Sequence, residues 1–254
     1  NVFDRAEQAV LIICLENNYY WRCNKMSKIY PSISFKTRMK KVTEDSEKLG
    51  QLAIESQRVA VDLLENFDKS KVEDLRKQTD EIDVFTIELE RKCIRFIASE
   101  QPFASDLMYI EATLRNISHI KRIGHLAMNI ADAIDQINFE NVPKKLVKEL
   151  AYMGDYVHLM LTKSIKAFLN QDLEKARELN SDDDKVDELF DNVLTQSTSL
   201  MSESKEGIEN FVQLIFIARY LERSADRAVN IGNRTIFMLT LKRPDIKSLD
   251  DDEE

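Results

Sequence analysis

From residue 34 onward, apolar residues recur every three or four positions, and charged residues fill most of the positions between them. Apolar residues at this spacing fall on one face of an α-helix, so the pattern predicts amphipathic helices. One such face contains Phe211, Leu214, Ala218, Leu221 and Ala225. We predict six long helices, near residues 34–66, 69–99, 103–136, 144–169, 173–201 and 205–241.

Polar residues and prolines mark the ends of these helices. Asp68 and Asp172 are suited to be N-caps, because an aspartate can accept a hydrogen bond from a free backbone amide of the first turn. Pro102 ends one helix and the segment 141–143, which finishes with a proline, ends another, because proline has no amide hydrogen to donate.

The six helices form two similar sets of three. Gly50 and Gly154 are 104 residues apart, and so are Asp68 and Asp172, Asp80 and Asp184, and Asp83 and Asp187. In the third helix of each set the offset is 101, which aligns Arg122, Ala127, Asn129 and Ile130 with Arg223, Ala228, Asn230 and Ile231. An internal repeat of this kind predicts an all-α fold made of two tandem three-helix bundles. We expect Gly50 and Gly154 to mark a close helix crossing.

The expected domain organisation follows from the repeat. It comprises an N-terminal extension at residues 1–33, a first bundle at 34–138, a second bundle at 143–241 and an acidic tail at 242–254. The extension is either non-native sequence or a docking helix. The tail ends in five consecutive acidic residues, which is typical of a solvated segment.

Composition supports a helical protein of the cytoplasm. Only 5 glycines and 4 prolines occur in 254 residues, while 32% of residues are charged. The three cysteines show no metal-binding spacing and favour a reducing compartment, with Cys93 expected in the core. A net charge of −9 argues against nucleic acid as a partner. No apolar run approaches the ~18 residues of a membrane span.

Two pairs of acids are the strongest candidates for a binding site. Asp183 and Asp187 are four residues apart on one predicted helix, and Glu222 and Asp226 are four apart on the next. Both pairs lie at a similar distance from the intervening turn, so an antiparallel hairpin brings them to the same level. Converging carboxylates protonate or recruit a hard cation such as Mg²⁺, Ca²⁺, Mn²⁺ or iron. The alternative is ordinary surface charge paired with nearby arginines.

The first repeat changes this pattern. Its equivalent positions hold Thr79, Asp83, Lys121 and His125. One acid remains, and a fixed cation lies across the predicted hairpin from it. Our hypothesis is that Lys121 pairs with Asp83 and substitutes for a metal. Two alternatives are an anion site formed by Lys121, Arg122 and His125, and simple surface charge. Neither a nucleophile–histidine–acid set nor a glycine-rich phosphate loop is present, which predicts a non-enzymatic protein.

Four segments carry a resemblance to a known family. They read DEIDVFTIELERKCIRFIASEQPFASDL at 80–107, HIKRIGHLAMNIA at 119–131, DDDKVDELF at 182–190 and ARYLERSADRAVNIG at 218–232. Over residues 34–241 the chain resembles the PhoU family, whose fold is two three-helix bundles. The family hallmark is an acid-x-x-x-Asp motif that binds metal clusters. This chain retains the motif at Asp183/Asp187 and Glu222/Asp226 but not in the first repeat.

The resemblance implies a regulator of phosphate uptake and of phosphate-starvation signalling. It implies a cytoplasmic adaptor that contacts the ATPase of a phosphate ABC transporter, and in many bacteria a sensor histidine kinase, and that is often a homodimer. The implied cofactors are divalent or trivalent metal ions, with iron, zinc, manganese, magnesium and calcium all compatible. Two alternatives stay open: a metal or polyphosphate storage scaffold, and a regulatory module of another ion transporter.

Overall fold

The computed structural model describes residues 33–203 and 207–242. In these residues the chain forms α-helices joined by short connections, and it forms no strand, which confirms the all-α prediction. The helices are α3 (Ile33–Asp62), α4 (Lys69–Glu100), α5 (Ser105–Ile134), α6 (Lys144–Leu169), α7 (Leu173–Glu203) and α8 (Ile208–Thr240), with a short 3₁₀-helix, η1 (Phe139–Asn141), before α6. The predicted extension, apart from Ile33, and the predicted tail beyond Lys242 lie outside the described residues.

The predicted helix boundaries have clear local causes. Asp68 has an extended backbone and accepts a hydrogen bond from the amide of Ser70 at 2.8 Å, which caps α4. Asp172 accepts a bond from the amide of Lys175 at 3.2 Å and caps α7 in the same way. Gln101 ends α4 in the left-handed conformation, with φ of 46°, and Pro102 follows it. Both aspartate caps were predicted from the sequence.

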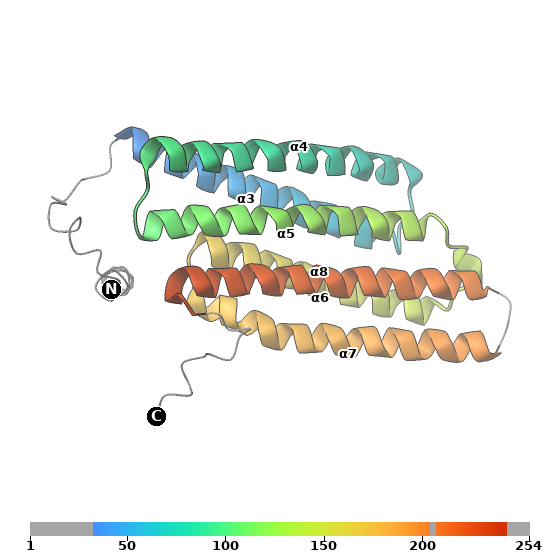
Figure 1. Ribbon diagram of the computed structural model, residues 1–254. Coiled ribbons are helices and arrows are strands. Elements are labelled where there is room, and N and C mark those ends of the chain that lie inside the picture. The colour runs from blue at the N-terminus through green and yellow to red at the C-terminus, as the bar shows by residue number, and fades with distance from the viewer. Residues whose placement is uncertain (1–32, 204–206, 243–254) are drawn as a thin grey trace, which may run out of the picture.

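The helices lie side by side as two repeats, α3–α5 and α6–α8 (Figure 1). We call these the first repeat and the second repeat. Between the repeats, α3 packs on α6 and α5 packs on α8, whereas α4 and α7 lie on opposite outer sides of the molecule. Each outer helix therefore contacts mainly the helices of its own repeat and leaves one face to solvent.

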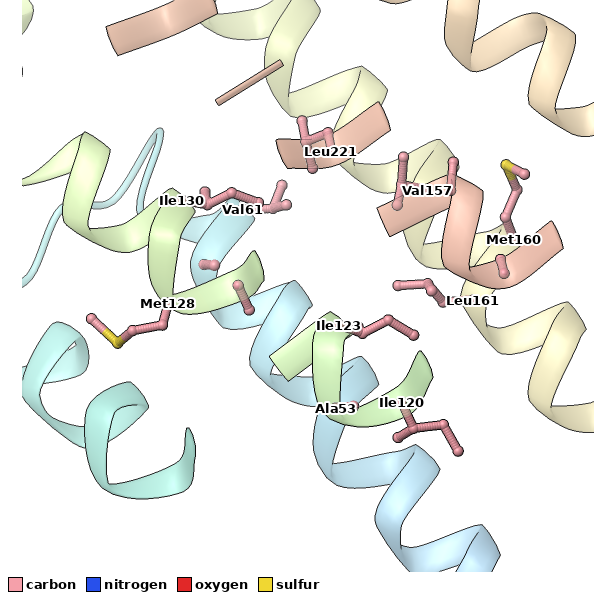
Figure 2. Packing of buried hydrophobic residues seen from close by; sticks show 14 of the residues in the cluster. Ala53, Val61, Ile120, Ile123, Met128, Ile130, Val157, Met160, Leu161 and Leu221 are labelled. Carbon is pink, nitrogen blue, oxygen red and sulfur yellow. The ribbon is translucent and has the colours of Figure 1, made fainter. Parts of the chain in front are cut away.

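One continuous hydrophobic core runs through both repeats. Its buried residues come from all six helices, and they include Cys93, which is fully buried as predicted. Figure 2 shows Ala53 and Val61 of α3, Ile123 of α5, Val157 of α6 and Leu221 of α8 in the region where the repeats meet. The two bundles are therefore not independent units, because each covers an apolar face of the other.

The two helical glycines predicted to mark a crossing do so. A Cβ atom on Gly154 of α6 would lie 2.6 Å from two methyl carbons of Val61 on α3. A Cβ atom on Gly50 of α3 would lie 2.9 Å from a methyl carbon of Ile165 on α6. Val61 and Ile165 are themselves 104 residues apart, so the two contacts are equivalent under the repeat. Two glycines thus allow α3 and α6 to approach closely at two matching points.

None of the helices in the described part of the chain combines the length and the apolar character that crossing a membrane requires.

Candidate functional site

Helices α7 and α8 form the antiparallel hairpin that carries the two acid pairs. Asp183, Glu222 and Asp226 are half-buried, whereas Asp187 is exposed at the rim. The negative charges of Asp187, Asp226 and Glu222 all act on Asp183, which shows that the acids of α7 and α8 face one another. We call these four side chains the acidic cluster. Helices α7 and α8 pack on each other, and the acids of both helices lie within electrostatic range of Asp183.

Electrostatic repulsion inside the acidic cluster is concentrated on Asp183. Burial, followed by the negative charges of Asp187, Asp226 and Glu222, raises the pKa of the Asp183 carboxyl to about 6. No hydrogen bond or ion pair to this carboxyl occurs within the described residues. A bound proton or a bound cation would therefore relieve more electrostatic repulsion at Asp183 than at the other acids of the cluster.

Glu222 has a partner of its own. Its carboxylate accepts hydrogen bonds from the Arg219 guanidinium one turn earlier, at 2.5 and 2.6 Å. Burial raises the pKa of Glu222, and the positive charge of Arg219 opposes this rise without cancelling it. The Arg219 guanidinium also lies over the ring of Phe190 on α7, 5.9 Å from its centroid. The pairing of a cluster acid with a nearby arginine, which was the alternative to a metal site, is thus present for Glu222.

The acidic cluster has the right chemistry for a hard cation, but its side chains are not arranged as a ligand set. Carboxylate oxygens suit Mg²⁺, Ca²⁺, Mn²⁺ and iron, and a bound cation would offset the negative charges that act on Asp183. In the described residues, however, no three His, Cys, Asp or Glu side chains converge closely enough to hold a metal ion. A metal ion bound by Glu222 would have to compete with Arg219 for this carboxylate.

A lysine from a third helix borders the acidic cluster and was not identified from the sequence. Lys163 of α6 donates to Asp182 at 2.8 Å and to Glu178 at 2.9 Å. Tyr156, also on α6, lies 3.5 Å from Asp182. Asp182 is therefore neutralised by α6, although it is adjacent to Asp183 in sequence. The spacing of residues along α7 cannot predict that Asp182 has a lysine partner and Asp183 does not, since this difference comes from the helix that each acid faces.

In the first repeat the structure brings three of the four predicted residues together. Lys121 Nζ lies 3.3 Å from Asp83 Oδ1, as the sequence predicts. His125 Nε2 lies closer, at 2.8 Å from the same oxygen, so the histidine is the nearer partner. Burial tends to raise the pKa of Asp83, but hydrogen bonds from His125 and Lys121 outweigh it and hold this pKa below its ordinary value.

Thr79 does not take part in this pairing. Its hydroxyl donates a hydrogen bond to the carbonyl of Leu75 at 2.9 Å, one turn earlier on α4, and the side chain is buried. The position equivalent to Asp183 is therefore an uncharged side chain satisfied by its own helix. Together, Thr79 and the Asp83 pairing leave the first repeat without the unbalanced negative charge of the second.

Comparisons with known proteins agree on one family. The PhoU domain matches twice, over residues 47–134 and 150–235. A phosphate-specific transport system accessory protein PhoU homolog from Methanothermobacter thermautotrophicus is 48% identical over 219 residues, which cover 86% of this chain and 100% of the relative. A Clostridium acetobutylicum homolog with the same description is 33% identical over 84% of this chain and 97% of the relative.

Solved structures show the same fold. The crystal structure of PhoU from Pseudomonas aeruginosa matches with a TM-score of 0.77 and 25% identity, covering 82% of this chain and 100% of that one. The phosphate transport system regulatory protein PhoU from Streptococcus pneumoniae matches with a TM-score of 0.77 and 26% identity, over 84% and 100%. The doubled domain, the full-length relatives and the shared two-repeat architecture lead to one conclusion: the chain belongs to the PhoU family.

Proposed function

We propose that this protein is a regulatory accessory of phosphate uptake. The observation that carries the proposal is the 48% identity to a phosphate-specific transport system accessory protein across the whole length of that relative. Proteins with unrelated functions often share a fold. A sequence identity at this level over both repeats is stronger evidence than a shared fold. The protein acts by binding rather than by catalysis, as a cytoplasmic adaptor for the ATPase of a phosphate ABC transporter.

Exposed apolar side chains on an outer helix support an adaptor role. Val84, Ile87 and Ile94 of α4 are 60%, 45% and 59% exposed, and they lie on the outward side of the first repeat. Large apolar side chains grouped on one helix face are characteristic of protein contact sites. A sensor histidine kinase is a second partner that this surface could serve, in a cell that contains one.

We further propose that the acidic cluster binds a metal ion. Asp183, Asp187, Glu222 and Asp226 would hold it, and the cation would offset the repulsion concentrated on Asp183. In the first repeat, Lys121 supplies the positive charge beside Asp83 and substitutes for a metal, and His125 contacts the same carboxylate. The two repeats then differ in function: one responds to metal, and the other is held by internal ion pairs.

Affinity capture tests the adaptor role. The tagged full-length protein, expressed in cells grown at high phosphate, should retain the transporter ATPase, and less should be retained after phosphate starvation. A variant with Val84, Ile87 and Ile94 changed to serine should lose the ATPase but keep its helical circular dichroism. If the wild-type protein retains metal but never the ATPase, a storage scaffold replaces the adaptor as the explanation.

Elemental analysis of the purified protein tests the metal site independently. Glu222→Ala and Asp226→Ala should each reduce the bound metal severalfold, because each removes a proposed ligand. Asp83→Ala in the first repeat is the matched control and should leave the metal content unchanged. Equal metal content in all of these proteins would exclude the acidic cluster as the binding site.

A further inference from the structure

A pocket of about 260 Å³ opens between α3 and α4, away from the acidic cluster. Four of its six lining residues are cations, and the other two are apolar. The lining consists of Arg38, Lys41, Val42, Lys92, Arg95 and Phe96. We call this site the basic pocket. Its charge is unusual for a chain whose net charge is −9.

Two of the four cations have acidic partners and two do not. Arg38 pairs with Glu100 at 3.0 Å, and Lys92 pairs with Asp45 at 2.8 Å. Lys41 and Arg95 form no ion pair with any described residue; Arg95 Nε donates only to the carbonyl of Arg91 in its own helix. Both side chains are exposed. The pocket therefore has positive charge available for an anionic ligand.

The internal repeat shows that the fold does not require these cations. An offset of 104 residues places Val142, Lys145, Gln196 and Ser199 at the positions of Arg38, Lys41, Lys92 and Arg95. Gln196 donates to Glu149, which is the counterpart of the contact between Lys92 and Asp45. The second repeat thus keeps this one contact but has only one of the four positive charges. The concentration of positive charge is a property of the first repeat alone.

We propose that the basic pocket binds the acidic segment at residues 250–254 of the same chain. This segment reads DDDEE and presents five consecutive carboxylates. Leu249 directly precedes it, and the pocket lining includes the apolar side chains of Val42 and Phe96. The sign of the charge and the apolar neighbour both match the pocket, and the two cations without an acidic partner can each bind a carboxylate. This inference is independent of the role in phosphate uptake proposed above.

The segment starts close enough to reach the pocket. Helix α8 ends at Thr240, at the same end of the molecule as the start of α3 and the end of α4 (Figure 1). Arg234, in the last turns of α8, pairs with Glu111 near the start of α5, and α5 packs directly on α3 and α4. Two helix-to-helix steps amount to roughly 20 Å. Seven residues lie between Lys242 and Asp250, and the eight steps from one Cα atom to the other can extend to about 28 Å.

The tether compensates for the weakness of surface ion pairs. Exposed ion pairs contribute little individually, and salt screens them. A connection of only a few residues, however, keeps the segment at an effective concentration on the order of millimolar near the pocket. Occupancy should therefore be high at low ionic strength and should fall as salt is added.

Zero-length carbodiimide cross-linking of the full chain, followed by peptide mapping, tests the contact. The reagent joins a lysine amine to a carboxylate that touches it, so Lys41 or Lys92 should become linked to an acid within residues 250–254. Arg95→Glu removes pocket charge without removing a reactive lysine, and it should lower the yield roughly fivefold. Arg91→Glu, one turn away and outside the pocket lining, is the matched control and should leave the yield unchanged.

The outcomes that overturn the proposal are specific. The exposed pair of Lys71 and Asp62, 2.7 Å apart, is the internal positive control, so a missing pocket link counts as evidence against the contact. An equal mixture of ¹⁴N- and ¹⁵N-labelled protein separates links within a chain from links between copies, and mixed-isotope links would replace the proposal with an intermolecular one. Links to Asp4, Glu7 or Glu16 would assign the pocket to the N-terminal segment instead.

Competition provides a second readout that does not depend on cross-linking. In one variant of the full chain, Asp250, Asp251 and Asp252 become asparagine, and Glu253 and Glu254 become glutamine. A fluorescent peptide with the sequence of residues 245–254 should bind this variant about tenfold more tightly than it binds the wild type, because the tethered competitor is gone. Adding Arg95→Glu should abolish the gain. Equal binding to wild type and neutralised variant would show that the segment does not occupy the pocket.

Discussion

Asp83 and Asp183 show how one residue type acquires opposite properties in two repeats of the same fold. The first lies against His125 and Lys121, and hydrogen bonds from these two side chains hold its pKa below the ordinary value. The second is partly buried near three other carboxylates, and burial together with their charges raises its pKa to about 6. Both acids are half-buried on the second helix of their repeat. Burial and the neighbouring Asp187 raise the pKa of Asp183, and the third helix adds two further acids to it, whereas the third helix of the first repeat presents His125 and Lys121 to Asp83.

The raised pKa of Asp183 makes stability depend on pH. Its folded value of about 6 exceeds the unfolded value of 3.8, so its contribution is complete below pH 3.8 and is lost as pH rises through 6. Asp183→Asn should therefore raise the free energy of unfolding by roughly 1 kcal/mol at pH 8 and leave it unchanged at pH 4. Urea unfolding in a chelating buffer measures both values. Asp191→Asn, an exposed acid on the same helix, should show no such pH dependence.

Asp83 has the opposite linkage. Its folded pKa lies below 3.8, so its pairing stabilises the protein above pH 3.8 and ceases to do so as pH falls through the folded value. Changing His125 to glutamine and Lys121 to methionine leaves burial unopposed, so the titration midpoint of Asp83 should move above 3.8. Carboxyl ¹³C NMR reports the midpoint directly. Lys77→Met, which breaks a pair with Asp74 elsewhere on α4, should not shift it.

At the scale of helices, the crossing of α3 and α6 depends on the absence of a side chain at two positions. In an open helix, replacing glycine by alanine is stabilising by about 1 kcal/mol, because alanine has less backbone freedom to lose. At Gly154 the added methyl would overlap Val61, so steric strain opposes that gain. The free energy lost to this steric overlap should exceed the free energy gained from the higher helix propensity of alanine. Neither α3 nor α6 can move away without disturbing the core that they share.

Gly154→Ala should consequently lower the free energy of unfolding by about 1–3 kcal/mol. Val61→Ala removes the two methyl carbons that clash, so the double variant should be more stable than the two single changes predict. The expected coupling energy is on the order of 1–2 kcal/mol, measured by urea unfolding of all four proteins. Lys148→Ala, at an exposed site on α6, controls for propensity. A stabilised Gly154→Ala variant would show that the helices do not approach closely in solution.

At the scale of the whole molecule, the two repeats are joined by a common interior. The cluster of buried side chains extends from α4 to α7 without interruption, through α3, α5, α6 and α8. Separating the repeats would expose apolar faces of α3, α5, α6 and α8 to water. Neither repeat is therefore expected to remain folded when the other unfolds.

Unfolding should accordingly be a single transition. Urea curves from far-ultraviolet circular dichroism and from amide hydrogen exchange at core residues of each repeat should share one midpoint. Leu89 represents the first repeat and Val193 the second, since both are buried on outer helices. Two midpoints, with Val193 protected differently from Leu89, would show that the repeats fold as separate units.

Much of this architecture could be predicted from the sequence because its causes are local or repeated. Helices follow from apolar spacing, Asp68 and Asp172 cap because they bind amides within the next few residues, and the repeat implies two sets of three helices. The level at which Asp183 and Glu222 meet follows from counting residues on either side of one turn. These inferences need only the fixed rise of a helix and a short connection.

Tertiary structure decided the partners of individual side chains. It made His125 the nearer partner of Asp83, directed Lys163 to Asp182 rather than to Asp183, and gathered four cations from α3 and α4 around one pocket. These outcomes depend on how each helix is rotated about its axis and how closely it packs on its neighbours. Packing of the shared core sets both quantities, and that packing depends on residues far apart in the chain.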